Sequence, residues 1–185
     1  MSDYRRNYVQ GGAYFFTVVT EKRINILNND KARECLRSAF QHCMKEYPFK
    51  IDAMVMLPNH IHAIWTLPDD DFDYSKRWGI IKKQFTQLWL AQGGFEIGIS
   101  KSKQRYRRRG VWQRRFWEHT LRNQDDYNRH FDYLHYNPIK HGVVRHLSDY
   151  PYSSFHRCVE QGIYQENWGS KYEAYFDFNE LDNLE

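Results

Sequence analysis

The chain is poor in cysteine, with only Cys35, Cys43 and Cys158 among 185 residues, and it has no Cys-x-x-Cys pair. An odd, scattered set argues against a disulfide scaffold or a zinc ribbon, and it fits a reducing compartment. The chain also lacks an apolar run of about 18 residues, so no membrane span is expected. Arg5 and Arg6 are followed by no apolar segment that would make a signal peptide. These absences predict a cytoplasmic protein.

Acidic residues are missing from one stretch and concentrated in another. Residues 101–115 read KSKQRYRRRGVWQRR, eight basic residues and no acidic one, whereas Glu173 to Glu185 holds five acids and no Lys or Arg. The net charge of +4 is modest, but this asymmetry predicts an anionic partner for the middle of the chain. Aromatic residues make up 17% of the sequence, and such side chains fill cores and also stack on unpaired bases.

The hydrophobic periodicity predicts an α+β fold in the order β-α-β-β-α-β, followed by a further helix. The predicted strands are 13–20, 51–57, 60–67 and 111–120, and the predicted helices are 30–46, 75–92 and a third that follows Asn123 and stops near Asn137, before Pro138. This order is typical of the ferredoxin-like fold, an antiparallel sheet with helices on one face. We expect one domain over residues 1–148. Residues 149–185 should form an extension that packs on it or is partly disordered.

The segment from Leu57 to Trp65 contains the most informative motif, the pair His60 and His62. Side chains two residues apart in a strand point to the same face, so both imidazoles should project together, with Ile61 turned away. Two neutral imidazoles on a rigid face can hold a divalent metal. A His-x-His pair also arises by chance, so the motif needs support from elsewhere in the chain.

The third predicted helix carries two stripes of side chains. Tyr127, Phe131 and Leu134 form an apolar stripe for packing, while a second stripe contains Tyr133 and Asn137 one turn apart. Asp126 and His130 continue this second stripe toward the start of the helix, and Asp126 stands at the third helical position, as in a capping box. A phenol beside an amide oxygen is an uncommon combination in a chain that also has a histidine pair and a basic loop.

Taken together, these motifs resemble those of the HUH nucleases. Over most of residues 4–157 the chain resembles one branch of them, the REP-associated tyrosine transposases, which use a single tyrosine. The matching stretches are 4–6, 11–18, 57–62, 82–86, 112–119 and 132–142. The basic connection at 93–110 departs from the family pattern and looks like an insertion.

The resemblance implies a role for each matching residue. His60 and His62 correspond to paired metal ligands, Asn137 to the third ligand and Tyr133 to the nucleophile, with Mg²⁺ or Mn²⁺ as the metal. By softness alone, two imidazoles and an amide suit Mn²⁺, Co²⁺ or Zn²⁺ better than Mg²⁺. On this basis residues 1–148 would be the catalytic domain.

Two other tyrosines on the same helix compete for the role of nucleophile. Tyr127 belongs to the packing stripe, which disfavours it. Tyr136 lies off the stripe of Tyr133, but near the helix end, where the geometry is looser. The sequence leaves this choice open.

The resemblance also implies a function. The protein would be a metal-dependent endonuclease and strand transferase, acting on single-stranded DNA with hairpins from repetitive extragenic palindromes (REP) through a 5′-phosphotyrosine intermediate. We expect it to be nucleoid-associated, a monomer or weak dimer, and without a membrane partner. The candidate DNA contacts are basic: Arg5, Arg6, Lys82, Lys83, Arg107, Arg108, Arg109, Arg114 and Arg115. Contacts of this kind to phosphates give affinity and salt dependence rather than sequence choice.

Two alternatives stay open at this point. A non-catalytic nucleic-acid-binding domain on the same fold would use its aromatic residues for stacking. A metal-dependent hydrolase would use an activated water and leave no covalent adduct. The acidic segment from Glu173 to Glu185, which also contains aromatic residues, could compete with DNA for the basic surface or be a passive end.

Overall fold

The computed structural model describes residues 6–98, 101, 105 and 109–170. Its strands are β1 (Ala13–Val19), β2 (Lys50–Leu57), β3 (His60–Thr66) and β4 (Trp117–Thr120), and its α-helices are α1 (Asp30–Glu46), α2 (Tyr74–Ala91), α4 (Gln124–Lys140) and α5 (Phe155–Glu160). Arg5, Arg107, Arg108 and the acidic segment from Glu173 to Glu185 lie outside the described residues. Within the described part of the chain, no helix is long and apolar enough to cross a membrane.

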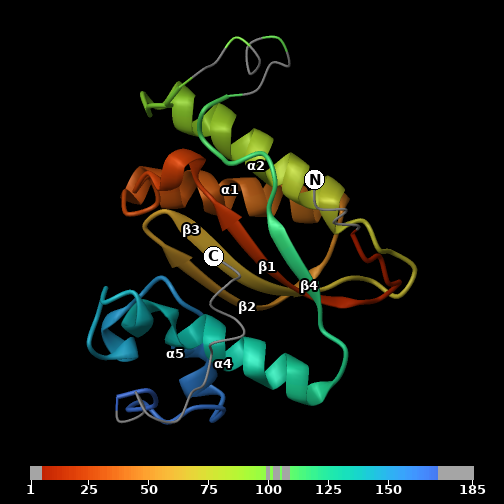
Figure 1. Cartoon of the computed structure of the whole chain (residues 1–185), viewed down its shortest axis with the longest axis vertical. Coiled ribbons are helices and arrows are strands. Elements are labelled where there is room, and N and C mark those ends of the chain that lie inside the picture. The colour runs from red at the N-terminus through yellow and green to blue at the C-terminus, as the bar shows by residue number, and fades with distance from the viewer. Residues whose placement is uncertain (1–5, 99–100, 102–104, 106–108, 171–185) are drawn as a thin grey trace.

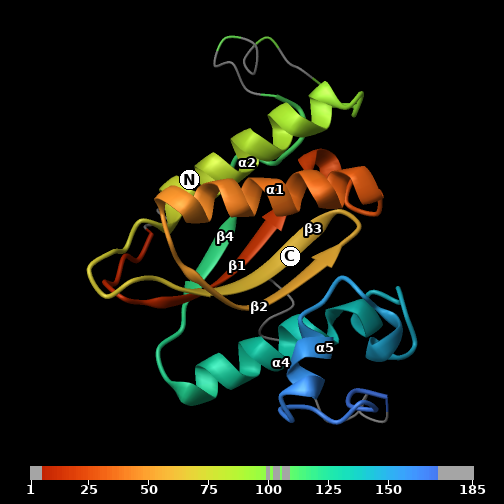
Figure 2. The same ribbon diagram turned by 180° about the vertical axis from the view of Figure 1, so that it is seen from behind.

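The four strands form one antiparallel sheet in the order β2-β3-β1-β4. Helices α1 and α2 cover one face, and α4 lies across the other with α5 beside it (Figures 1 and 2). The predicted ferredoxin-like α+β fold is confirmed. Among the long helices that the structure describes, only α4, which carries Tyr133, covers the second face.

Because helices cover both faces of the sheet, the central strands are buried along nearly their whole length. In β1, Tyr14 and Phe16 belong to the core beneath α1 and α2. The intervening Phe15 turns to the opposite face and packs in the core beneath α4, together with Tyr133. This alternation explains how one short strand serves two cores.

The predicted helix starts are confirmed by their side-chain caps. Asn29 Oδ1 accepts the backbone N–H of Lys31 at 3.0 Å, and Asn123 Oδ1 accepts that of Asp126 at 2.9 Å. Each bond satisfies a backbone donor that has no partner within its own helix.

The predicted end of the last helix is wrong, because α4 runs through Pro138 to Lys140. Proline removes a single donor, the one that would bond to the carbonyl of Leu134. The helix still closes after it, since the backbone N–H of His141 donates to Asn137 O at 2.9 Å. This extra turn brings two further residues into the site described below.

The predicted strand over 111–120 is too long, because β4 covers only Trp117–Thr120, with an isolated bridge between Thr20 and Trp112. The side chain of Lys82 explains part of the break. Its ammonium donates to the carbonyls of Gln113 at 2.6 Å and Arg114 at 3.2 Å, so these oxygens are turned toward α2.

The described part of the chain after Ser148 contains regular secondary structure. It includes α5, and Ser153 forms a bridge with Val55 at the outer edge of β2. Tyr150 holds the same segment against β2, since its hydroxyl donates a hydrogen bond to Met56 O at 2.6 Å. The described part of the extension therefore packs on the sheet and covers its edge.

Candidate active site

The imidazoles of His60 and His62 lie side by side on the face of β3 that α4 covers. Their ring centroids are 4.8 Å apart, and the residues are 2% and 0% exposed. The Nδ1 of His60 donates to Asn59 Oδ1 at 2.6 Å, and the Nδ1 of His62 is hydrogen-bonded to Thr17 Oγ1 at 3.0 Å. Bonds at Nδ1 fix the ring orientation and make Nε2 the nitrogen that can bind a metal.

Helix α4 places Tyr133 and Asn137 against this pair. The ring of Tyr133 lies 5.6 Å from that of His62. Asn137, which is 0% exposed, donates from Nδ2 to the carbonyl of Tyr133 at 2.8 Å. This bond orients the amide so that its Oδ1 is buried, and Oδ1 has no hydrogen-bond partner among the described residues.

A buried amide oxygen without a donor costs free energy, and a bound cation would remove that cost. The donor set of two imidazole nitrogens and one amide oxygen therefore fits a divalent metal. His60, His62 and Asn137 are the residues that could hold it.

Two residues that the sequence analysis did not assign complete this region. Lys140 donates from Nζ to the hydroxyl oxygen of Tyr133 at 3.1 Å. The ring of His141 lies 5.1 Å from that of His60. Both belong to the turn that extends α4 beyond Pro138. The predicted helix end near Asn137 left them outside the helix, so the sequence analysis did not indicate that they share a face with Tyr133. Their position seven or eight residues after Tyr133 was the signal in the sequence, because two helical turns bring a side chain back to the same face.

The two rival tyrosines have other surroundings. Tyr136, 8% exposed, belongs to the apolar cluster that α4 forms with the segment after it. Tyr127 stacks on Phe131 with ring centroids 5.8 Å apart, and burial raises the pKa of its phenol to about 12. The ring of Tyr133 contacts that of His62, and this contact favours Tyr133 among the tyrosines of α4.

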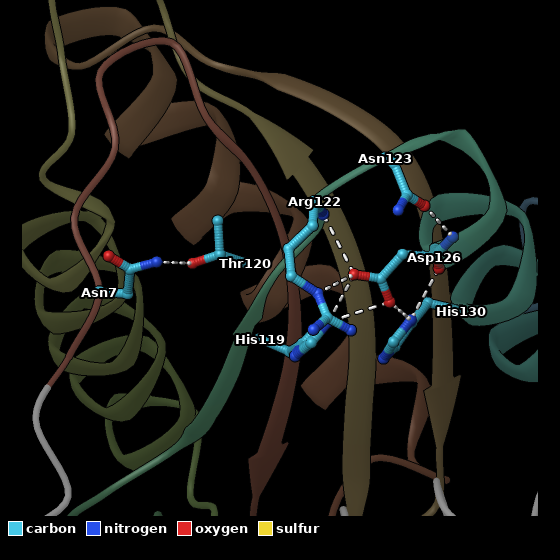
Figure 3. Close-up of polar contacts among 7 residues, drawn as sticks. All are labelled: Asn7, His119, Thr120, Arg122, Asn123, Asp126 and His130. Atoms are coloured by element: carbon cyan, nitrogen blue, oxygen red, sulfur yellow. Dashed lines mark hydrogen bonds and ion pairs between the residues drawn. The ribbon is translucent and has the colours of Figure 1, made fainter.

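A second group of polar side chains lies at the beginning of α4 (Figure 3). His119 of β4 approaches Asp126, with His119 Nε2 2.9 Å from Asp126 Oδ2. Arg122 and His130 also bond to Asp126, with N–O distances of 3.0 and 3.2 Å. The sequence analysis placed Asp126 and His130 on the stripe of Tyr133 but missed His119, which comes from a different element.

Some of the predicted DNA contacts are used inside the protein. The ammonium of Lys82 is bound by two backbone carbonyls, and burial lowers its pKa to about 8. Arg6 bonds to Ser75 and lies 3.8 Å from Glu118, and Arg109 pairs with Glu96. A role for Lys82 as an outward phosphate contact is therefore disfavoured.

The other described candidates, Lys83, Arg114 and Arg115, are exposed. They lie on α2 and on the segment that leads into β4. Helix α2 lies on the face of the sheet that α1 also covers, and the segment before β4 lies at the β4 edge (Figure 1).

The comparisons with known proteins agree with this architecture. Residues 8–137 match the family model described as "Transposase IS200 like". The chain is 44% identical over 169 residues to the REP-associated tyrosine transposase of Escherichia coli K12, covering 91% of both proteins. It is 46% identical over 169 residues to a protein of the corresponding name from Haemophilus influenzae Rd, covering 91% of this chain and 94% of the relative. A solved structure of a REP-associated tyrosine transposase bound to a REP hairpin has a TM-score of 0.76 at 45% identity, with 91% of each chain covered.

A ferredoxin-like sheet with a His-x-His strand opposite a tyrosine-bearing helix is thus the architecture of an IS200-like transposase, and this chain belongs to that family. Within the family it belongs with the REP-associated tyrosine transposases.

Proposed function

We propose that the protein cuts and rejoins single-stranded DNA at REP-type hairpins, with Tyr133 as the nucleophile and Mg²⁺ or Mn²⁺ as cofactor. The observation that carries the proposal is the approach of Tyr133 to the histidine pair, with 5.6 Å between the rings of Tyr133 and His62. The relative of solved structure that is bound to a REP hairpin supports the substrate class.

The proposed chemistry is a transesterification. The phenolic oxygen of Tyr133 gives up its proton and attacks the scissile phosphorus. The bond to the 3′ oxygen breaks, and that oxygen takes up a proton and leaves as a 3′-hydroxyl. The product is a phosphodiester between Tyr133 and the 5′ phosphate. Because the number of phosphodiester bonds is unchanged, a 3′-hydroxyl can attack this ester and rejoin a strand without ATP.

Lys140 supports the attack in this scheme. Its ammonium already donates to the phenolic oxygen of Tyr133 at 3.1 Å. A cationic donor stabilises negative charge on an oxygen better than it stabilises the neutral hydroxyl. Tyr133 is 0% exposed and Lys140 is half-buried beside it, so this hydrogen bond is largely shielded from water and is stronger for it.

The metal would be held by His60, His62 and Asn137. A metal bound there would supply a Lewis acid that polarises a non-bridging phosphate oxygen and orients the phosphate. Asn59 and Thr17, through the two Nδ1 atoms, keep both imidazoles in the orientation that binding needs. The exposed Lys83, Arg114 and Arg115 supply positive charge for the DNA backbone.

The test is incubation of the full chain with a 5′- or 3′-labelled REP-type hairpin single strand and Mg²⁺ or Mn²⁺, followed by denaturing electrophoresis. A protein-linked band that carries the 5′-phosphate side of the cut supports the proposal. Cleavage without such a band would indicate an activated water instead. Tight binding without cleavage under either metal would indicate a non-catalytic binding domain.

A further inference from the structure

The sheet-facing stripe of α4 carries a second constellation, at the opposite end from Tyr133 and Asn137. Asp126 and His130 come from the first two turns of the helix, and His119 comes from β4 across from them (Figure 3). One ligating atom from each of the three residues lies within 4.8 Å of the others. Phe15 separates this cluster from the first site, since its ring lies 5.3 Å from His62 and 5.0 Å from His130.

The contacts of Asp126 with the two imidazoles are close to the spacing of ligands in a tetrahedral metal site, but each contact uses a different carboxylate oxygen. Zinc–ligand bonds of about 2.0–2.1 Å place ligand atoms about 3.3 Å apart at the corners of a tetrahedron. Asp126 Oδ2 is 2.9 Å from His119 Nε2, and Asp126 Oδ1 is 3.2 Å from His130 Nδ1. The rings of His119 and His130 are stacked, with centroids 4.5 Å apart and 14° between their planes, so one ring must turn for all three side chains to bind one cation.

The protonation states also suit a metal. Burial alone raises the pKa of Asp126, but the hydrogen bonds from His119 and Arg122 outweigh this effect and lower it to about 2. Burial lowers the pKa of His130, so its imidazole is held neutral. The cluster therefore offers a carboxylate and the neutral imidazole of His130, while a metal would displace the Nε2 proton that His119 donates to Asp126.

His130 has a buried nitrogen that the protein does not use. Its residue is 2% exposed, and its Nε2 has no hydrogen-bond partner among the described residues. Its Nδ1 donates to the carbonyl of Asp126 at 2.8 Å. A neutral imidazole carries one proton, and the bond to the carbonyl places it on Nδ1, so the lone pair that can bind a metal is on Nε2.

The guanidinium of Arg122 lies on the solvent-exposed side of the cluster. Arg122 Nε lies 3.0 Å from Asp126 Oδ2, and its side chain is 73% exposed. A guanidinium so exposed can swing into solvent and leave its position to a metal ion and a water.

We propose that His119, Asp126 and His130 form a second divalent-cation site, separate from the one at His60 and His62. Two imidazoles and a carboxylate favour Zn²⁺ or Co²⁺ over Mg²⁺. Because its ligands come from both β4 and the first turns of α4, the ion would fasten the tyrosine-bearing helix to the sheet. This inference does not depend on the reaction proposed for Tyr133.

The experiment uses the full-length His60→Ala/His62→Ala variant, which lacks the imidazoles of the first site. Calorimetric titration with Zn²⁺ should give one ion per chain, and Co²⁺ should give the intense visible absorption of tetrahedral coordination. Adding His119→Gln should weaken Zn²⁺ binding by more than about 100-fold, because loss of a second-shell partner alone costs 10–100-fold. Its amide can still donate to Asp126, which protects the fold.

His42→Ala in the same background is the matched control, because His42 is an exposed histidine on α1, and it should leave the affinity unchanged. Circular dichroism and thermal unfolding verify that each variant is folded, and Zn²⁺ should raise the unfolding temperature only where His119 is present. Lack of Zn²⁺ binding in the His60→Ala/His62→Ala variant would overturn the proposal. Equal affinities in the His119→Gln and His42→Ala variants would overturn it too.

Discussion

Lys140 donates a hydrogen bond to the hydroxyl oxygen of Tyr133 from seven residues further along the same helix, at 3.1 Å. Its ammonium also lies 4.8 Å from the centre of the tyrosine ring. The contact exists because α4 continues through Pro138 for one more turn. A residue outside the histidine pair therefore places positive charge on the atom that we propose as nucleophile.

Replacing Lys140 should slow the formation of the covalent adduct and leave DNA binding nearly unchanged. Lys140→Met removes the donor and the charge but keeps a long, flexible side chain. A hydrogen bond that involves a charged group is worth about 1.5–3 kcal/mol, so its loss should slow the reaction about 10- to 100-fold, and Lys140→Arg should recover part of the rate. Single-turnover adduct formation at saturating DNA measures the effect. An unchanged rate in Lys140→Met would show that the contact has no role in the attack.

Tyr133→Phe should abolish the adduct while the protein stays folded and binds the hairpin. The change removes one hydroxyl and keeps the ring that packs against Phe15 and His62. Tyr136→Phe, in the apolar cluster of the same helix, is the matched control and should react normally. Adduct formation by the Tyr133→Phe variant, with none by Tyr136→Phe, would assign the nucleophile to Tyr136 instead.

Cleavage should require both histidines of β3 and should depend on Asn137 to a smaller degree. His60→Ala or His62→Ala removes an imidazole ligand and should abolish activity. Asn137→Ala removes the amide oxygen, the weakest donor of the set, and should raise the Mg²⁺ or Mn²⁺ concentration that half-maximal cleavage requires. Metal titrations of cleavage rate compare the three variants. Normal activity and metal dependence in His62→Ala would exclude this ligand set.

Features that depend on local repetition could be predicted from the sequence. Alternation along a strand put His60 and His62 on one face, and helical spacing put Tyr133 and Asn137 on one stripe. The order of strands and helices then indicated the sheet. None of these steps needed knowledge of a distant contact.

Other features could not be predicted, since they depend on contacts between distant segments. The break in the predicted last strand depends in part on Lys82. Its ammonium donates to the carbonyl oxygens of Gln113 and Arg114, which lie 31 and 32 residues further along the chain. From the sequence alone, Lys82 is predicted to be a charged residue on the surface, because nothing in the sequence indicates these two hydrogen bonds. His119 is only seven residues from its partner Asp126, but the two lie on different elements, so their contact becomes evident only when β4 lies beside α4.

The stability of the fold should fall as the pH drops from about 6.5 to about 4, in part because of His135. Burial lowers the pKa of this imidazole from 6.5 to about 4. Between these values the unfolded chain binds the proton more tightly, so the stability that the neutral His135 contributes is complete above pH 6.5 and is lost on acidification. The loss is roughly 3 kcal/mol at most. Urea unfolding across this range, for the chain and for His135→Gln, should show a shallower pH dependence in the variant. Parallel curves would mean that His135 does not titrate in this way.

The neighbouring lysines of α2 should give opposite phenotypes. Lys83 is exposed, so Lys83→Ala should leave stability unchanged and weaken binding to all single strands alike. Each lost phosphate contact should reduce the slope of log affinity against log salt by about 0.7, and adding Arg114→Ala and Arg115→Ala should reduce it further. Lys82→Ala instead removes the donor of two carbonyls and should destabilise the fold by about 1–3 kcal/mol.

The salt slope of Lys82→Ala should then match that of the unmodified chain, once the measurement is made on folded protein. Electrophoretic shifts at several salt concentrations, with a hairpin and an unrelated single strand, separate the two effects. A reduced slope for Lys82→Ala with intact stability would show that its ammonium leaves the carbonyls and binds phosphate. A loss of affinity in Lys83→Ala for the hairpin alone would show that Lys83 reads its shape or sequence rather than its charge.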